Sequence, residues 1–220
     1  AVAFSAAQNL ELGIGKLFLV SRNLEKLNQV KAEVLEKNSD VKVFCYDVDL
    51  AHVASLEEMV ELCVKESSGQ VDYVINNAGY VDPKSVVETT YENFDLTFKL
   101  NCYAPFFLIR KLISLRVYPK TIINVASTAG LSARPGWSAY ASSKAALINL
   151  TDTLSEELKG FGVRVMSVAP GRCATDLRKR LAPEEDPSTI MQPQDVAQVV
   201  NHLLGDMGKF IDKQCLVIKK

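Results

Sequence analysis

The sequence predicts an α/β fold in which a doubly wound, parallel β-sheet is covered by helices on both faces. Strand-like apolar runs alternate along the chain with longer segments of helical periodicity. The runs are apolar at most positions, which is typical of parallel strands buried under helices on both sides. With 220 residues, 48% of them hydrophobic, the chain can bury one sizeable core. Residues 1–220 are therefore predicted to form a single domain.

The expected strands and helices follow from these apolar patterns. Strands separated by helices imply βαβ crossovers, and hence the parallel sheet. Residues 172–192, which include Pro183 and Pro187, form the longest irregular stretch and are predicted to act as a lid. The strands are expected at residues 16–20, 41–48, 71–77, 121–127, 163–170 and 215–218. The helices are expected at about 23–37, 53–67, 88–116, 137–159 and 193–205.

The first residues, AVAFSAAQNLELG, have a helical pattern with no strand before them. Open sheets that bind dinucleotides begin with a strand and a glycine-rich turn, whose N–H groups meet the pyrophosphate. Gly13-Ile14-Gly15 does not fit that turn, because a strand follows it at once and leaves no room for the helix. We therefore expect a chain that begins inside its first helix and lacks roughly 15–20 residues of strand and phosphate loop.

Charge, hydropathy and cysteine content exclude several classes of function. A net charge of −1 and a pI near 6.2 give no electrostatic reason to expect nucleic acid or a membrane surface as a partner. No apolar run approaches the ~18 residues of a membrane span. The five cysteines are scattered and the two histidines lie apart from the motifs below, so disulfides and metal sites are not expected. We expect a cytoplasmic protein, with an organelle left open because a targeting signal would lie upstream of Ala1.

Tyr140 and Lys144 stand four residues apart in a segment of helical pattern, and Ser127 ends an apolar run 13 residues before Tyr140. In a helix, residues i and i+4 lie on one face, so the ammonium would lie beside the phenol and favour its ionised form. Work near neutral pH requires a shift of about 3 units from about 10, or roughly 4 kcal/mol. Such a tyrosine can exchange a proton with a carbonyl oxygen or an alcohol.

The same spacing occurs a second time, at Tyr80 and Lys84. With 7 tyrosines and 25 basic residues in the chain, a chance occurrence is unsurprising. Pro83 excludes a helix there, so these two side chains need not meet. We interpret this pair as coincidental.

Other motifs agree with Ser127, Tyr140 and Lys144 in order and spacing. Asn76-Asn77-Ala78-Gly79 follows the apolar run VDYVI, and Asn101 lies in KLNCYAPFF. The run FCYDV ends in Asp47 and Val48, while Pro170, Gly171 and Thr175 form a P-G-x-x-x-T segment after another strand. Each motif alone marks only a turn, a strand end or a core amide in many proteins. Together they resemble the short-chain dehydrogenase/reductase family over essentially all 220 residues.

This resemblance implies a Rossmann-like, NAD(P)-binding domain that transfers a hydride between a nicotinamide cofactor and a carbonyl or alcohol. In the family, the serine orients the carbonyl, the tyrosine exchanges the proton, and the lysine lowers the pKa of the tyrosine and binds the nicotinamide ribose. The family's asparagine holds a water in the proton relay. The implied catalytic residues are Asn101, Ser127, Tyr140 and Lys144. The implied cofactor-binding residues are Arg22, Asp47 beside the adenine, Val48, Asn77, Ala78 and Gly79 near the ribose, Tyr140, Lys144, and Pro170, Gly171 and Thr175 near the nicotinamide carboxamide.

The end of the strand at 16–20 favours NADP over NAD. A carboxylate there usually binds a free ribose 2′-hydroxyl, whereas an arginine accommodates a 2′-phosphate. Here the chain reads Ser21-Arg22-Asn23, with a guanidinium and no carboxylate. The alternative is that Arg22 is only a solvated residue at the start of a helix.

The sequence predicts the substrate class less specifically than it predicts the reaction. GWSAY and SSKAA resemble reductases of small diketones and pterin side chains, whereas the C-terminal region resembles reductases of sugar-alcohol metabolism and of 3-oxoacyl groups. A truncated, catalytically impaired or regulatory relative that binds rather than catalyses is the alternative function.

Association into a homodimer or homotetramer is implied through residues 88–116 and 137–159, the helices that family members use. An apolar stripe at helical spacing is formed by Leu147, Leu150, Leu154 and Leu158. That stripe fits either the core or an interface between copies.

Overall fold

A computed structural model describes residues 12–211 and 215–220. The described residues divide into two compact units. The first unit takes its residues from Ala1–Asp47, Pro170–Asp212 and Val217–Lys220, and the second from Val48–Ala169 and Lys213–Leu216. The helix expected at the start of the chain lies almost wholly outside the described residues.

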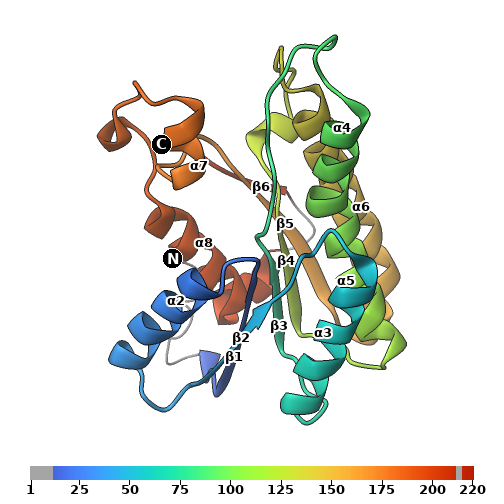
Figure 1. Cartoon of the computed structure of the whole chain (residues 1–220). Coiled ribbons are helices and arrows are strands. Elements are labelled where there is room, and N and C mark those ends of the chain that lie inside the picture. The colour runs from blue at the N-terminus through green and yellow to red at the C-terminus, as the bar shows by residue number, and fades with distance from the viewer. Residues whose placement is uncertain (1–11, 212–214) are drawn as a thin grey trace. The chain divides into compact units, whose positions relative to one another are not determined.

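In the first unit, strands β1 (Lys16–Ser21) and β2 (Lys42–Asp47) form a parallel pair, and helix α2 (Leu24–Lys37) connects them (Figure 1). The side chain of Asn23 accepts a hydrogen bond from the N–H of Lys26 at 2.9 Å, which caps the helix. Helix and strands close over a small apolar core made of Leu19, Leu27, Val34, Val41 and Val43. The register pairs Ser21 with Asp47, so both strands end at the same edge.

A four-stranded sheet has the order β3-β4-β5-β6. Its strands are β3 (Tyr73–Asn76), β4 (Thr121–Val125), β5 (Arg164–Pro170) and β6 (Cys215–Ile218). Parallel pairing joins β3 to β4 and β4 to β5, as expected for βαβ crossovers. In the described part of the chain, the ends of all six strands lie within two residues of the ends of the segments that the apolar pattern predicts.

The helices of the second unit are α3 (Val53–Glu66), α4 (Tyr91–Phe98), α5 (Ala104–Ser114) and α6 (Ser138–Leu158). The predicted continuous helix over 88–116 is wrong in one respect, because a turn of π-helix, Lys99–Tyr103, separates α4 from α5. Such single π-turns are frequent at functional sites. Helices α3 and α5 pack side by side (Figure 1).

The leucine stripe of α6 belongs to the core. Leu147, Leu154 and Leu158 are buried, and Leu150 packs against the cluster of Ala126, Leu147 and Ala169. Of the two readings that the sequence leaves open for this stripe, burial within the unit supports the core.

Two further helices that the structure describes are α7 (Asp176–Leu181) and α8 (Pro193–Leu204), both in the first unit. Helix α8 begins with a reciprocal capping box between Gln192 and Asp195. Helix α7 lies inside the stretch predicted to be irregular. Short 3-10 turns occupy Thr128–Gly130, Lys159–Phe161, Pro187–Thr189 and Asp206–Phe210.

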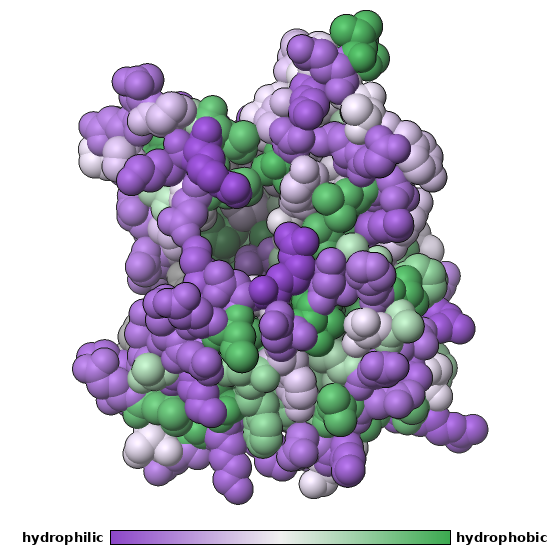
Figure 2. All heavy atoms as spheres, in the orientation of Figure 1, coloured by the Kyte–Doolittle hydropathy of each residue, from purple (hydrophilic) through white to green (hydrophobic). Residues whose placement is uncertain are grey.

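Hydrophilic residues cover most of the face in Figure 2, and hydrophobic residues form scattered patches between them. Among the described residues, no helix is long and apolar enough to cross a membrane. Within the same residues, no group of three or more His, Cys, Asp or Glu could hold a metal ion.

Candidate active site

Lys144 is held inside the second unit with its charge pointing at a backbone carbonyl. Only 4% of the residue is exposed, and its Nζ donates a hydrogen bond to the carbonyl oxygen of Val125, the last residue of β4, at 2.8 Å. Burial lowers the pKa of Lys144 from 10.5 to about 8, because desolvation disfavours the ammonium. The lysine therefore titrates much closer to neutral pH than a surface lysine does.

Tyr140 lies one helical turn before Lys144 on α6, as the spacing predicts. The Nζ of Lys144 is 5.9 Å from the centre of the Tyr140 ring. The ring also meets the edge of Trp137, with the two ring centres 5.7 Å apart and the planes at 71°. Phenol, ammonium and indole thus share one small region at the start of α6.

The predicted direction of the Tyr140 pKa is wrong for the chain in this structure. Burial raises the pKa of Tyr140, while a hydrogen bond with Ser127 and the charge of Arg134 act in the lowering direction. Desolvation outweighs both because the phenol is largely shielded from water. Lys144 directs its ammonium at Val125, so it does not provide the lowering that the motif implies.

Ser127 follows β4, and its side chain forms a hydrogen bond with Tyr140. Its Oγ accepts a hydrogen bond from the N–H of Ala129 at 3.1 Å, which caps the 3-10 turn Thr128–Gly130. That turn lies directly against α6. A Cβ on Gly130 would lie 2.7 Å from the carbonyl carbon of Lys144, a distance that real Cβ atoms do not show. The absence of a side chain on Gly130 therefore lets the turn after Ser127 lie directly against α6.

Asn101 is fully buried within the π-turn and serves as a clamp. Its Oδ1 accepts from the N–H of Tyr80 at 2.8 Å, and its Nδ2 donates to the carbonyl of Tyr80 at 2.8 Å and to the Oγ of Ser143 at 3.0 Å. The Ser143 hydroxyl in turn donates to the carbonyl of Tyr140 at 2.8 Å. Asn101 therefore ties the loop after β3 to the first turns of α6. Its two amide hydrogens are both used, and its part in a water relay stays a prediction.

A second buried polar chain supports the sheet below the site. Asn76 donates through Nδ2 to the Oδ1 of Asn124 at 2.7 Å, and Asn124 donates to the Oγ1 of Thr151 at 2.9 Å. These bonds connect β3, β4 and α6. Because buried polar groups are costly when unpaired, these hydrogen bonds favour one arrangement of the three elements.

Three predicted cofactor residues form an exposed strip beside the catalytic candidates. Asn77, Ala78 and Gly79 follow β3 and are all exposed. A Cβ on Gly79 would lie 3.0 Å from the Oδ1 of Asn101 and 3.6 Å from the Nζ of Lys144. This open backbone next to a lysine fits the close approach of a ribose. Val48 follows β2 and is half-buried in the same unit.

Arg22 and Asp47 lie in the first unit, where β1 and β2 end. Both are exposed, and the pairing of Ser21 with Asp47 puts the two strand ends together. A guanidinium and a carboxylate at one strand edge suit the phosphate-bearing ribose and the amino group of an adenosine. Binding of a cofactor by Arg22 and Asp47 stays a prediction.

Pro170, Gly171 and Thr175 also lie in the first unit. The N–H of Gly171 donates to the carbonyl of Ile218 at 2.9 Å. Thr175 is the N-cap of α7, where its hydroxyl accepts from the N–H of Arg178 at 3.2 Å. The hydroxyl thus has a local structural partner, and its contact with a carboxamide stays a prediction.

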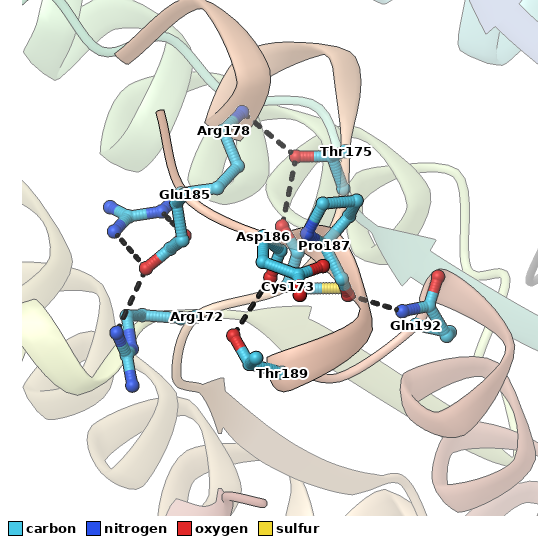
Figure 3. A network of polar contacts seen from close by, with 9 residues as sticks. All are labelled: Arg172, Cys173, Thr175, Arg178, Glu185, Asp186, Pro187, Thr189 and Gln192. Carbon is cyan, nitrogen blue, oxygen red and sulfur yellow. Dashed lines mark hydrogen bonds and ion pairs between the residues drawn. The ribbon is translucent and has the colours of Figure 1, made fainter. Parts of the chain in front are cut away.

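Polar contacts link residues of the stretch 172–192 to one another (Figure 3). The carboxylate of Glu185 accepts from Arg172 at 2.8 Å and from both Nε and Nη2 of Arg178 at 2.5 and 2.8 Å. The pKa of Glu185 is lowered to about 2, and the hydrogen bond with Arg178 is the largest cause. This bidentate pair closes α7 back onto the following turn.

Several residues that shape the site have no place in the sequence motifs. Two of them could have been noticed in the sequence: Gly130 is a glycine three residues after Ser127, and Asn124 is a polar residue inside an apolar strand. Arg134 stands before a Pro-Gly pair, which marks a turn but not the direction of the side chain. Ser143, which precedes Lys144, carried no signal.

The family model of short chain dehydrogenases matches residues 4–186. The chain belongs to the short-chain dehydrogenase/reductase family. It is 28% identical to the 3-oxoacyl-(acyl-carrier-protein) reductase of Thermotoga maritima over 94% of this chain and 92% of that protein. Among solved structures, levodione reductase superposes with a TM-score of 0.86 at 26% identity, covering 99% of this chain and 92% of its own. An NAD⁺-bound xylitol dehydrogenase superposes with a TM-score of 0.84 at 25% identity, covering 99% of this chain and 93% of its own.

Family membership establishes two expectations from the sequence. The fold is Rossmann-like, with parallel strands and covering helices, as in these structural neighbours. The chain is a short-chain dehydrogenase/reductase oxidoreductase of the nicotinamide-dependent kind that acts on small molecules.

Proposed function

We propose that this chain catalyses reversible, NADP-linked hydride transfer between a carbonyl and an alcohol. One observation carries the proposal. The Tyr140 phenol, the Ser127 hydroxyl that hydrogen-bonds to it, and the Lys144 ammonium 5.9 Å from its ring converge in one partly buried place. These groups are what proton exchange with a carbonyl oxygen requires.

Each residue has a separate task in this scheme. Ser127 donates a hydrogen bond to the carbonyl oxygen and orients it. Tyr140 gives its proton to the oxygen as negative charge develops there, or takes a proton from the alcohol in reverse. The nicotinamide, when bound, supplies or accepts the hydride. Lys144, whose Nζ is 5.9 Å from the centre of the Tyr140 ring, binds the nicotinamide ribose in this scheme, and the clamp at Asn101 keeps the start of α6 in position.

The choice of NADP rests on Arg22. The residue is exposed at the end of β1, in a segment Ser21-Arg22-Asn23 that has no carboxylate. A guanidinium can bind a 2′-phosphate through two hydrogen bonds, and a carboxylate in its place would repel the phosphate. The name of one neighbour specifies NAD⁺, so NAD is the alternative that the measurements must compare.

The proposed substrate is a small carbonyl compound: a ketone, a diketone, a pterin-like carbonyl or a 3-oxoacyl group. The names of two similar proteins, a 3-oxoacyl reductase and a levodione reductase, support the 3-oxoacyl and ketone classes.

The test is a panel of these carbonyls assayed for NADPH oxidation, with NADH in parallel. Tyr140→Phe removes only the hydroxyl that carries the proton, and we expect a fall in kcat of roughly 100-fold or more, the usual scale of general-acid catalysis. The control is Tyr118→Phe, which removes the same hydroxyl from an exposed ring stacked on Phe161. Near-normal turnover by the Tyr140 variant would contradict the scheme.

We also propose that the chain forms a homo-oligomer through α4 and the π-turn. Tyr91 is 79% exposed, and Phe94 and Tyr103 are 41% and 45% exposed. The ring centres of Phe94 and Phe98 are 5.0 Å apart and those of Phe98 and Tyr103 are 6.2 Å apart, so these three rings form one aromatic cluster that is partly exposed. Phe94→Glu should shift the sedimentation coefficient to that of a monomer, while Phe210→Glu, at an 83% exposed position, should not. A wild-type chain that sediments as a monomer refutes the proposal.

A further inference from the structure

Residues Arg134-Pro135-Gly136-Trp137 form a tight turn just before α6. The N–H of Trp137 donates to the carbonyl of Arg134 at 3.1 Å, and Gly136 has a positive φ of 78°. Proline at the second position and glycine with positive φ at the third are the signature of a type II β-turn. Such a turn brings its first and last residues side by side.

The Arg134 guanidinium is consequently fixed between the two segments that carry the catalytic candidates. Its Cζ lies 6.0 Å from the centre of the Trp137 ring, in range of a cation–π contact. Its Nη2 donates to the Oγ1 of Thr128 at 3.1 Å, and Thr128 is the neighbour of Ser127. Trp137 in turn meets the ring of Tyr140. The guanidinium thus contacts both Thr128, the neighbour of Ser127, and Trp137, the ring that packs against Tyr140.

No aspartate or glutamate among residues 12–211 and 215–220 forms an ion pair with Arg134. Other arginines of the chain do have such partners, as Arg110 does with Glu57 and Arg178 with Glu185. A guanidinium carries five N–H donors, and Thr128 takes one. The charge of Arg134 also acts in the direction of lowering the pKa of Tyr140, so its field reaches the phenol.

A half-buried cation without a carboxylate partner, held rigidly beside a proton donor, is suited to an anion that arrives with the substrate. We propose that Arg134 binds an anionic oxygen pair of the substrate, a carboxylate or a phosphate-like group a few bonds from the reacting carbonyl. This inference rests on the proposed function and adds a substrate class to it: oxo acids and their phosphorus analogues over neutral ketones.

The test compares three matched substrates under NADPH: 3-oxobutanoate, its phosphonate analogue 2-oxopropylphosphonate, and the neutral methyl 3-oxobutanoate. The wild-type chain should show a higher kcat/KM for at least one anion than for the ester. Arg134→Gln should lower kcat/KM for that anion by roughly 10- to 100-fold, the scale of a charge-assisted hydrogen-bond pair. The loss for the ester should stay within about 3-fold, and Arg134→Lys should recover part of the anion activity, because it restores charge without the planar fork. The anion that is preferred distinguishes a carboxylate site from a phosphate site.

Arg110→Gln is the control, since it removes an exposed arginine from α5 and should change none of the three values. Equal losses for ester and anions in Arg134→Gln would show that the arginine only holds the turn, and would overturn the inference. A wild-type chain that reduces the ester as well as the anions also overturns the inference, but it leaves the proposed function standing.

If no carbonyl is reduced, calorimetric titration of the NADP⁺-loaded protein with 2-oxopropylphosphonate tests the inference. Binding that Arg134→Gln abolishes supports the anion site, and binding that is unchanged or absent refutes it.

Discussion

The ammonium of Lys144 lies 5.9 Å from the centre of the Tyr140 ring, yet it donates its hydrogen bond to the carbonyl of Val125. The two side chains share one face of α6, as residues four apart should. What the spacing does not fix is the direction of the charge. In the structure the lysine is stabilised by the end of β4, and burial dominates the titration of both groups.

The first prediction concerns the pH dependence of stability. Lys144 has a pKa of about 8 in the folded chain, against 10.5 as its ordinary value. Between these values the unfolded state binds one more proton than the folded state, so the free energy of unfolding should rise with pH in this window. Below about pH 8 the folded chain bears the full penalty of charging the buried amine, about 3 kcal/mol for such a shift.

Lys144→Met removes that penalty together with one hydrogen bond of about 1 kcal/mol. We expect the variant to be about 2 kcal/mol more stable than the wild type at pH 7, with the advantage shrinking toward pH 10. Urea unfolding at several pH values measures this, with Lys37→Met at an exposed position as the control. A variant that is less stable at pH 7, or that has the same pH dependence as the wild type, would contradict the prediction.

A second prediction concerns the contact of Gly130 with α6. An added Cβ would lie 2.7 and 2.8 Å from backbone atoms of Lys144 and Ala145, which cannot rotate away. Gly130→Ala should therefore lower the free energy of unfolding by about 1–3 kcal/mol, the usual range for overpacking. The serine should also be displaced from Tyr140, so that kcat falls.

Gly160→Ala is the matched control, because nothing lies within 4 Å of a Cβ at that position. Its stability should change by no more than about 0.5 kcal/mol, with kcat unchanged. If Gly130→Ala behaves like Gly160→Ala in both measurements, the turn does not position Ser127.

The cofactor prediction concerns Arg22. Arg22→Ala should raise the Kd for NADPH by roughly 10-fold or more, since it removes a charge-assisted contact with the 2′-phosphate. The Kd for NADH should change by less than about 2-fold. Fluorescence titration of the reduced cofactors measures both, and Lys37→Ala, which removes a positive charge from the far end of α2, serves as the control. Equal losses of affinity for both cofactors would refute the assignment to NADP.

The strands were predictable because a buried parallel strand leaves a direct trace, an apolar run of a few residues between turns. Each of the six strands among residues 12–211 and 215–220 follows such a run. Two helical features left no such trace. The π-turn at Lys99–Tyr103 changes the hydrogen-bond register without changing the apolar pattern, and α7 is a short, charged helix held by its Thr175 cap and the pair of Arg178 with Glu185.

The sequence by itself determined the fold class, the family motifs and the spacing that stacks Tyr140 above Lys144, because these depend on periodicity along a single chain segment. Only the tertiary structure decided the direction of the Tyr140 pKa, the clamp between Asn101 and Ser143, and the contact of Arg134 with the Trp137 ring. Each of these depends on desolvation and on contacts between residues distant in sequence. Desolvation and these contacts arise only when the segments pack together.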